Sequence, residues 1–204
     1  MKLALKGLTL EADLTIPKEA VGVVIFAHGS GSSRKSPRNK MVAEELNKAG
    51  HATLLFDLLT KEEDKDPKKR FDIELLSDRL IDVACYLQTM PETRSLKQGL
   101  FGASTGAAAA LRCAASLRHQ ISAVVSRGGR PDLAGGFLPI VLSPTLLIVG
   151  GNDTIVIDLN KQAFAELSCE KKLEIIEGAS HLFEEPGTLA QVAGLATKWF
   201  TKFF

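Results

Sequence analysis

Leu100-Phe101-Gly102-Ala103-Ser104-Thr105-Gly106 stands near the middle of the chain, where an apolar run meets an alanine-rich segment. A Gly-x-Ser-x-Gly pentapeptide between a strand and a helix is typical of a sharp turn that presents the serine hydroxyl at the top of a sheet. Small residues flank Ser104 because larger side chains would clash where such a turn is tightest. The N–H of Thr105, which opens the following helix, would point toward a developing oxyanion. The stretch therefore predicts a nucleophilic serine on a fold of alternating strands and helices.

Strand and helix patterns alternate on both sides of Ser104. Continuous apolar runs such as residues 21–27 and 145–150 are typical of strands buried on both faces. The alternation favours an α/β fold with a mostly parallel central sheet and helices on both faces. An antiparallel strand pair is predicted at 3–7 and 8–16, further strands at 21–27, 53–56, 99–103, 121–126, 145–150 and 173–176, and helices at 37–49, 71–90, 107–118, 159–167 and 189–203.

Composition excludes several broad classes of protein. The 204 residues, 45% of them hydrophobic and 24% charged, are typical of one soluble globular domain spanning residues 1–204. A net charge of +1 gives no reason to expect nucleic acid or a membrane surface as partner. Three widely spaced cysteines favour reduced thiols over disulfides or a metal site. Residues 1–7 lack a long apolar segment, so we expect a cytoplasmic protein.

Ser104, Asp153 and His181 each follow the end of a predicted strand, in that chain order. Chemistry in such sheets belongs at the carboxyl ends of the strands, which meet at one edge. An imidazole, with a reference pKa of about 6.5, is suited to taking a proton from Ser104 and returning it. Asp153 would fix the imidazole tautomer and stabilise the imidazolium. Asp153 also suits a turn after a strand, His181 also suits a surface position, and Asp158 is the reserve candidate for the acid.

The chain resembles the α/β-hydrolases, and among them the small dienelactone hydrolase-like proteins, from about Val21 to its end. The resemblance implies Ser104 as nucleophile, His181 as base and Asp153 as the orienting acid. We expect neither a cofactor nor a metal. It also implies an oxyanion hole from the N–H groups of Thr105 and Ser30, the latter preferred over Gly29, while His28 would support the loop. The motifs that carry it are His28-Gly29-Ser30-Gly31, Gly102-Ala103-Ser104-Thr105-Gly106, Gly150-Gly151-Asn152-Asp153 and Gly178-Ala179-Ser180-His181.

One position departs from the family pattern. The dienelactone hydrolases proper carry cysteine at the nucleophile position, where this chain has Ser104. The serine favours a general ester or thioester hydrolase over a lactone hydrolase, with an acyltransferase sharing the same acyl-enzyme. We therefore expect hydrolysis of a small soluble carboxylic ester or thioester.

Three arginines near the predicted sheet edge bear on the substrate. Arg34 follows the first glycine-rich loop, and Arg127 and Arg130 flank two glycines after a strand. If these loops converge over Ser104, guanidinium groups would hold an anionic group of the substrate bidentately. The alternative is local ion pairing, for example between Arg130 and Asp132.

Two connecting segments set expectations about access to the site. Residues 61–70 are rich in charge and are interpreted as a solvated loop. Residues 131–144 are too short for a helical lid, which favours an open site and small soluble substrates over interfacial lipids.

Two other functions fit parts of the sequence. Gly29-Ser30-Gly31 after a strand, with Asp57 after the next, imitates a dinucleotide-binding fingerprint of an oxidoreductase. Arg34 stands where the third glycine of that fingerprint would fall, and a bulky side chain there hinders close packing of helix on strand. A non-catalytic binding protein on the same fold is the other alternative, because fold does not fix function.

Overall fold

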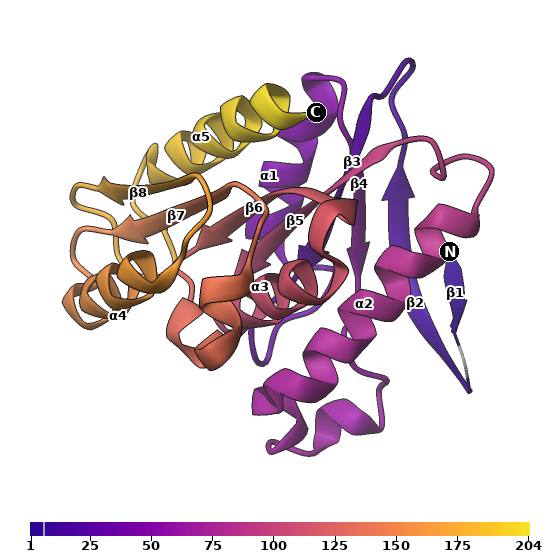
Figure 1. Ribbon diagram of the computed structural model, residues 1–204, viewed down its shortest axis with the longest axis horizontal. Helices are drawn as coiled ribbons and strands as arrows, with labels where there is room; N and C mark the ends of the chain where they lie inside the picture. Colours follow the sequence, from indigo (N-terminus) through magenta and orange to yellow (C-terminus); the bar gives the residue numbers. More distant parts are fainter. Residues whose placement is uncertain (6) are drawn as a thin grey trace.

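A computed structural model describes residues 1–5 and 7–204 of the chain, which form an eight-stranded sheet (Figure 1). The strand order is β1-β2-β4-β3-β5-β6-β7-β8. The pairs β1–β2 and β2–β4 are antiparallel, and all the pairs from β4 to β8 are parallel. The strands are β1 (Lys2–Leu5), β2 (Leu8–Thr15), β3 (Gly22–Ala27), β4 (Ala52–Phe56), β5 (Lys97–Ala103), β6 (Ile121–Arg127), β7 (Thr145–Gly150) and β8 (Lys171–Ile176).

Helices cover both faces of the sheet. Figure 1 shows α1 and α5 together on one face and α2, α3 and α4 on the other. Each layer encloses its own cluster of buried apolar side chains, so the sheet is packed on both sides. The helices are α1 (Pro37–Lys48), α2 (Ile73–Thr89), α3 (Thr105–Leu117), α4 (Thr154–Glu166) and α5 (Thr188–Phe203).

The central strands are buried from end to end. Every residue of β3, β4 and β7 is buried, as their continuous apolar sequences predict. The predicted α/β fold with a mostly parallel sheet and an antiparallel N-terminal pair is confirmed. Lys6, within the first predicted strand, lies outside the described residues.

Two segments that were expected to be irregular contain short 3-10 helices. Residues 61–70 include turns at Glu63–Lys65 and Lys69–Phe71. Thr60 and Glu63 cap each other, since each backbone N–H donates to the other's side chain, and Arg79 of α2 binds Glu63 at 2.7 Å. The segment is therefore anchored to the fold, although it is rich in charge.

The second segment, Pro131–Ile140, is also helical in part. Its 3-10 turns kink at Gly135 and pack on α3 and α4, with Ala134 and Leu138 in the core. The segment was expected to be too short for a helical lid, and its short turns pack against α3 and α4, where its apolar residues fill the space between the two helices.

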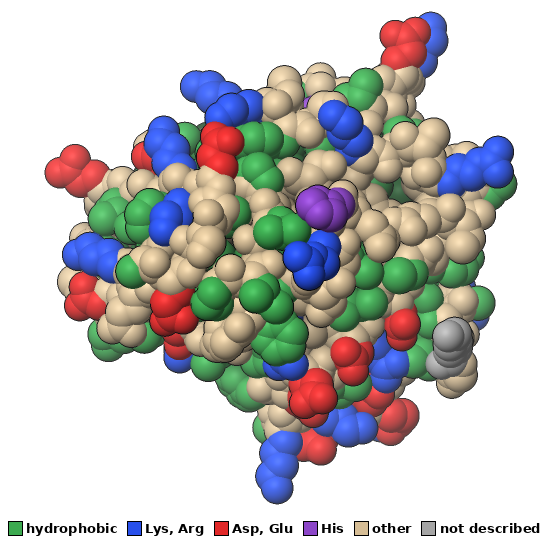
Figure 2. Space-filling model, in the orientation of Figure 1, with side chains coloured by type: hydrophobic (Ala, Val, Ile, Leu, Met, Phe, Trp, Pro, Cys, Tyr) green, Lys and Arg blue, Asp and Glu red, His purple; other side chains and the backbone are tan. Residues whose placement is uncertain are grey.

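The surface carries mixed charge. On the face shown in Figure 2, basic and acidic side chains are interspersed around the molecule. Within residues 1–5 and 7–204, none of the helices combines the length with the apolar composition that a membrane span requires.

Candidate active site

Ser104 lies on a strained turn between β5 and α3. Its φ of 50° and ψ of −122° are unusual for a residue with a side chain, and such backbone strain persists only where the surroundings impose it. Here the end of β6 and the loop after it impose the strain. The Ser104 N–H donates to the Arg127 carbonyl at 3.3 Å, and the Ser104 carbonyl accepts from the N–H of Arg130 at 3.0 Å.

Two glycines let the backbone close tightly around Ser104. A Cβ on Gly102 would stand 2.4 Å from Cα of Ala107, and one on Gly106 would stand 2.2 Å from the carbonyl oxygen of Ala27. Both distances are far below van der Waals contact with backbone atoms that cannot turn aside. The glycines of the pentapeptide are therefore required by packing, which explains why the sequence places them on either side of Ser104.

His181 and Asp153 are in contact, as the sequence analysis expected. Nδ1 of His181 lies 2.6 Å from Oδ2 of Asp153. This bond assigns the ring proton to Nδ1 and leaves Nε2 as the nitrogen that can accept a proton. The reserve candidate, Asp158, instead lies 3.6 Å from Lys161 with 72% of its side chain exposed. The structure thus brings Asp153 and not Asp158 to the histidine.

The turns that carry this pair are joined through the backbone. The Asn152 N–H donates to the Ala179 carbonyl at 2.9 Å, and the Asn152 side chain donates to the Gly178 carbonyl at 2.8 Å. Gly150 permits the approach, because a Cβ there would stand 2.5 Å from the carbonyl oxygen of Ala179. The turn after β7 and the loop after β8 therefore hold each other in register.

Ser104 and His181 each lie against the end of β6, at neighbouring residues. A Cβ on Gly128 would stand 2.9 Å from the carbonyl oxygen of His181 and 3.7 Å from its Cε1 atom. The preceding residue, Arg127, is the one that bonds the backbone of Ser104. Among residues 1–5 and 7–204, the Ser104 hydroxyl has no hydrogen-bond partner.

The loop after β3 lies directly against the serine. A Cβ on Gly29 would stand 3.0 Å from Cβ of Ser104. The N–H of Ser30, an expected oxyanion donor, donates to Oγ1 of Thr105 at 2.9 Å. The sequence analysis assigned a role only to the backbone of Thr105, so this side-chain contact was missed.

His28 supports this loop, in the role that the sequence analysis gave it. Its Nε2 accepts from the Leu58 N–H at 3.0 Å, so the ring proton is on Nδ1, which donates to the Gly29 carbonyl at 3.0 Å. Burial lowers the pKa of His28, which favours this neutral form. The ring thereby fixes the Gly29–Ser30 peptide, whose N–H faces Thr105.

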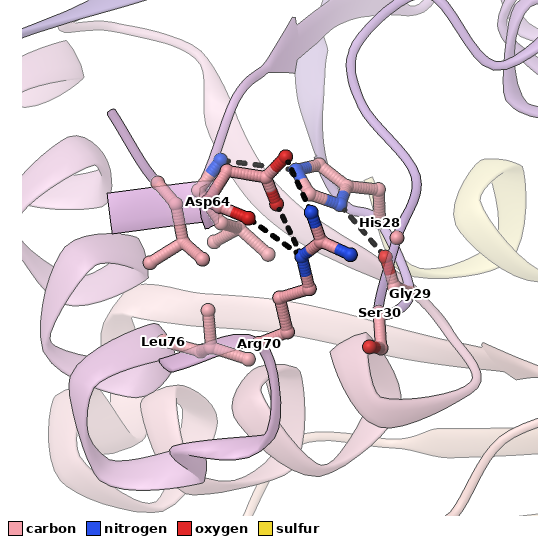
Figure 3. A pocket seen from close by; sticks show the side chains of 9 residues that line it. His28, Gly29, Ser30, Asp64, Arg70 and Leu76 are labelled. Carbon is pink, nitrogen blue, oxygen red and sulfur yellow. Dashed lines mark hydrogen bonds and ion pairs between the residues drawn. The ribbon is translucent and has the colours of Figure 1, made fainter. Parts of the chain in front are cut away.

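A small cavity adjoins the same loop (Figure 3). It has a volume of about 200 Å³, its open mouth included. Arg70 turns toward Asp64 across the cavity from His28, Gly29 and Ser30, and its Nε donates to the carbonyl and to Oδ1 of Asp64 at 2.8 and 3.0 Å. Residues 28–31, Leu58, Leu59, Asp64, Arg70 and Leu76 line it.

The three arginines differ in their partners. Arg34 binds Asp57 at 2.6 Å, and Arg130 binds Asp132 through two hydrogen bonds at 2.9 and 2.8 Å, as the local alternative expected. The ion pair with Arg34 occupies Asp57, which is the acid that the dinucleotide-binding alternative needs to bind a ribose. Arg127 is only 7% exposed, and Nη2 of its guanidinium donates to Oδ1 of Asn39 in α1 at 3.2 Å.

Arg127 is a buried cation in positive surroundings. Within the described part of the chain, no carboxylate lies within 4.0 Å of its guanidinium, and its Nε is buried without a hydrogen-bond partner. Burial, and then the neighbouring charge of Arg38, lower the pKa of Arg127 to about 10, so the group stays protonated at neutral pH. Among the residues described, no group of three or more His, Cys, Asp or Glu side chains is placed to hold a metal ion.

Comparison with known proteins shows one family. A sequence model described as "Dienelactone hydrolase family" matches residues 10–203. A solved dienelactone hydrolase from Anabaena variabilis is 53% identical, with a TM-score of 0.97 over 100% of this chain and 96% of that one. Est1E from Butyrivibrio proteoclasticus shares the fold, with a TM-score of 0.85 at 17% identity over 99% of this chain and 97% of that one.

Curated relatives carry a different name. Two Mycobacterium tuberculosis proteins, each named "Putative phosphoribosyl transferase", are 60% identical over 187 residues. The match covers 92% of this chain but 42% of those proteins. More than half of each relative thus has no counterpart here.

Proposed function

The chain belongs to the dienelactone hydrolase family, and we propose that it hydrolyses a small soluble carboxylic ester or thioester through an acyl-enzyme on Ser104. The observation that carries this proposal is the 2.6 Å contact between His181 and Asp153, at the sheet edge where the strained turn presents Ser104. Nucleophile, base and orienting acid are the three parts that acyl transfer by a serine requires.

The reaction has two stages. Ser104 attacks the carbonyl carbon while Nε2 of His181 takes the hydroxyl proton, and the resulting imidazolium is stabilised by Asp153. His181 then gives this proton to the departing alcohol or thiol as the bond to the leaving group breaks. Water, deprotonated by the same nitrogen, hydrolyses the acyl-enzyme and restores Ser104.

Negative charge on the carbonyl oxygen needs donors at the start of α3. The N–H of Thr105 is at the positive end of the helix, directly after Ser104. The N–H of Ser30 is the second proposed donor, held close to the first by its bond to the Thr105 hydroxyl. Losing one such donor typically costs about a hundred- to a thousandfold in rate.

The cavity beside Ser30 is lined on its apolar side by Leu58, Leu59 and Leu76, and its enclosed space has room for about one water molecule. It therefore favours a substrate with only a small group at this position. The proposal also includes action in the cytoplasm and independence of cofactors, metals, nucleic acids and membranes.

We further propose that the substrate carries an anionic group, and Arg127 is the arginine that supports this. Arg34 and Arg130 already bind carboxylates of the chain, whereas Arg127 binds none among residues 1–5 and 7–204. A buried cation without a counter-ion is costly, and an anionic group on the substrate would offset that cost. Replacing Arg127 with Gln should raise KM for 4-nitrophenyl hydrogen succinate and leave KM for 4-nitrophenyl butyrate unchanged. Arg130→Gln is the matched control, and equal effects of Arg127→Gln on both esters would exclude the anion site.

The first experiment is labelling by a fluorophosphonate probe, together with ester hydrolysis by the same samples. We expect an adduct on Ser104 in the wild type, no adduct in Ser104→Ala and little in His181→Ala, with ester hydrolysis lost in parallel. A folded wild type that neither reacts with the probe nor hydrolyses short esters would favour the non-catalytic alternative. The relatives named as phosphoribosyl transferases are much longer than the region that matches this chain. The assay therefore uses this chain and not a longer protein.

A further inference from the structure

The Thr105 hydroxyl lies between the two backbone groups proposed to hold the oxyanion. It belongs to the residue whose N–H is the first donor, and its oxygen accepts the N–H of Ser30, the second, at 2.9 Å. Thr105 is only 5% exposed, so this contact is sheltered from competing water. The Ser30 N–H is therefore already engaged when the site is empty of substrate.

The hydroxyl of Thr105 has one hydrogen for which the described residues offer no acceptor. A threonine hydroxyl has one O–H donor and two acceptor lone pairs. The Ser30 N–H occupies an acceptor position, and no acceptor for the O–H lies among residues 1–5 and 7–204. The hydrogen is free to meet an oxygen that arrives with the substrate.

A second threonine shows what this hydroxyl does elsewhere in the fold. Thr188 is the first residue of α5, as Thr105 is of α3, and both are 5% exposed. The Thr188 hydroxyl donates to the Glu185 carbonyl, three residues earlier, at 2.8 Å. Thr105 makes no such bond within the described chain, because the preceding residues run straight into β5 through the strained Ser104. Its hydrogen is not used to begin the helix.

We propose that Thr105 is a catalytic residue whose O–H donates a hydrogen bond to the oxyanion, while its oxygen keeps the bond from Ser30. The oxyanion is then held directly by the N–H and the O–H of Thr105, and Ser30 acts through the hydroxyl. This inference rests on the proposed function, and it refines the role that the proposal gives to Ser30.

The arrangement favours the transition state over the bound ester. A hydrogen bond to a charged oxygen is roughly twice as strong as one to a neutral carbonyl, so the O–H contributes most as charge develops. The Ser30 N–H polarises the hydroxyl further, because hydrogen bonds in a chain strengthen one another. Interactions that strengthen only in the transition state raise kcat and leave KM nearly unchanged.

The test replaces Thr105 with Val, which keeps the shape and removes the hydroxyl, and with Ser, which keeps the hydroxyl. With 4-nitrophenyl acetate, Thr105→Val should lower kcat by about ten- to a thousandfold, while KM changes by less than about threefold. Thr105→Ser should stay within about fivefold of the wild type. A trifluoromethyl ketone, which forms an oxyanion on Ser104, should lose affinity for Thr105→Val in proportion to kcat/KM. Thr188→Val is the control, with a lowered Tm and an unchanged kcat.

Three outcomes would overturn the inference. One is a Thr105→Val variant with the kcat of the wild type or higher, which would show that Ser30 serves the oxyanion directly once the hydroxyl is gone. Another is an equal loss in Thr105→Val and Thr105→Ser, and the third is a loss confined to KM and Tm. The proposed function is tested separately, because it fails if the wild type does not hydrolyse the ester or if Ser104→Ala hydrolyses it as fast as the wild type.

Discussion

The two halves of the candidate active site are held by different means. On the half around Ser104, backbone packs on backbone: Gly106 lies so close to Ala27 that no Cβ fits. The strained turn is also bonded to Arg127, the last residue of β6, and to Arg130 in the loop that follows. On the half around His181, the backbone turns are also joined, but the ring itself depends on one bond, from Nδ1 to Asp153.

The fold fixes the position of Ser104, whereas the orientation of the His181 ring depends on a side-chain contact. The backbone of Ser104 fixes the direction of its Cβ, so the fold places the hydroxyl to within a rotation about the Cα–Cβ bond. The imidazole can rotate, and 39% of its side chain is exposed, against 16% for Asp153. A change on the first half should therefore damage the fold, and a change on the second should damage the chemistry while the fold persists.

Of the changes that test this difference between the two halves, replacing Gly106 with Ala should have the largest effect on stability. Its Cβ would stand 2.2 Å from the Ala27 carbonyl oxygen and 2.6 Å from that of His28. Because backbone atoms must move, we expect a loss of at least about 3 kcal/mol in the free energy of unfolding, with activity lost as well. Gly194→Ala in α5, where nothing lies within 4 Å, should instead raise stability by about 0.5–1 kcal/mol. Urea unfolding measures both, and a Gly106→Ala variant of normal stability would contradict the packing argument.

Replacing Asp153 with Asn tests the other half. The amide can no longer accept the Nδ1–H with the strength of a carboxylate, and it admits the wrong tautomer, so kcat should fall by about a hundred- to ten-thousandfold. The Tm should change little, because the backbone bonds of this turn come from its neighbours. Asp158→Asn, at an exposed position beside Lys161, is the control and should keep full activity. If Asp158→Asn lost as much activity as Asp153→Asn, the assignment of the acid would be wrong.

Much of this arrangement follows from the order of elements along the chain. Reading the ends of the parallel strands was enough to expect Asp153 beside His181, and that contact is observed, while the catalytic roles remain predictions. The start of α4 was placed too late, at 159 instead of Thr154, because its first four residues, Thr154 to Ile157, are all β-branched and such residues have a lower helix propensity. The short turns at Glu63–Lys65 and Lys69–Phe71 have no apolar periodicity at all.

Contacts between distant side chains could not be read from the sequence. Arg127 meets Asn39 across 88 residues, and its burial depends on how α1 packs over the end of β6. The bond between Ser30 and Thr105 spans 75 residues and needs the loop after β3 to lie against α3. Motifs predict which residues reach an edge of the sheet, whereas tertiary packing decides which of them lose their partners or gain new ones.

The smallest expected effect concerns a polar residue buried on the Ser104 half. Because burial lowers the pKa of His28, the folded protein holds the neutral ring, whereas the unfolded chain takes up a proton below about pH 6.5. The stability that this neutral ring contributes is complete above pH 6.5 and is lost as the pH falls through the lower pKa of the folded state.

Replacing His28 with Gln should therefore flatten the fall of Tm between pH 7.5 and 5, measured by thermal unfolding. His51→Gln should flatten it too, since burial also lowers the pKa of His51, whose Nε2 bonds Thr201 far from the site. Only His28→Gln should also reduce kcat, because the Gly29–Ser30 peptide loses the ring that orients it. Equal activity in the two variants would mean that the loop of residues 28–31 is fixed by backbone packing alone, as the turn at Ser104 is.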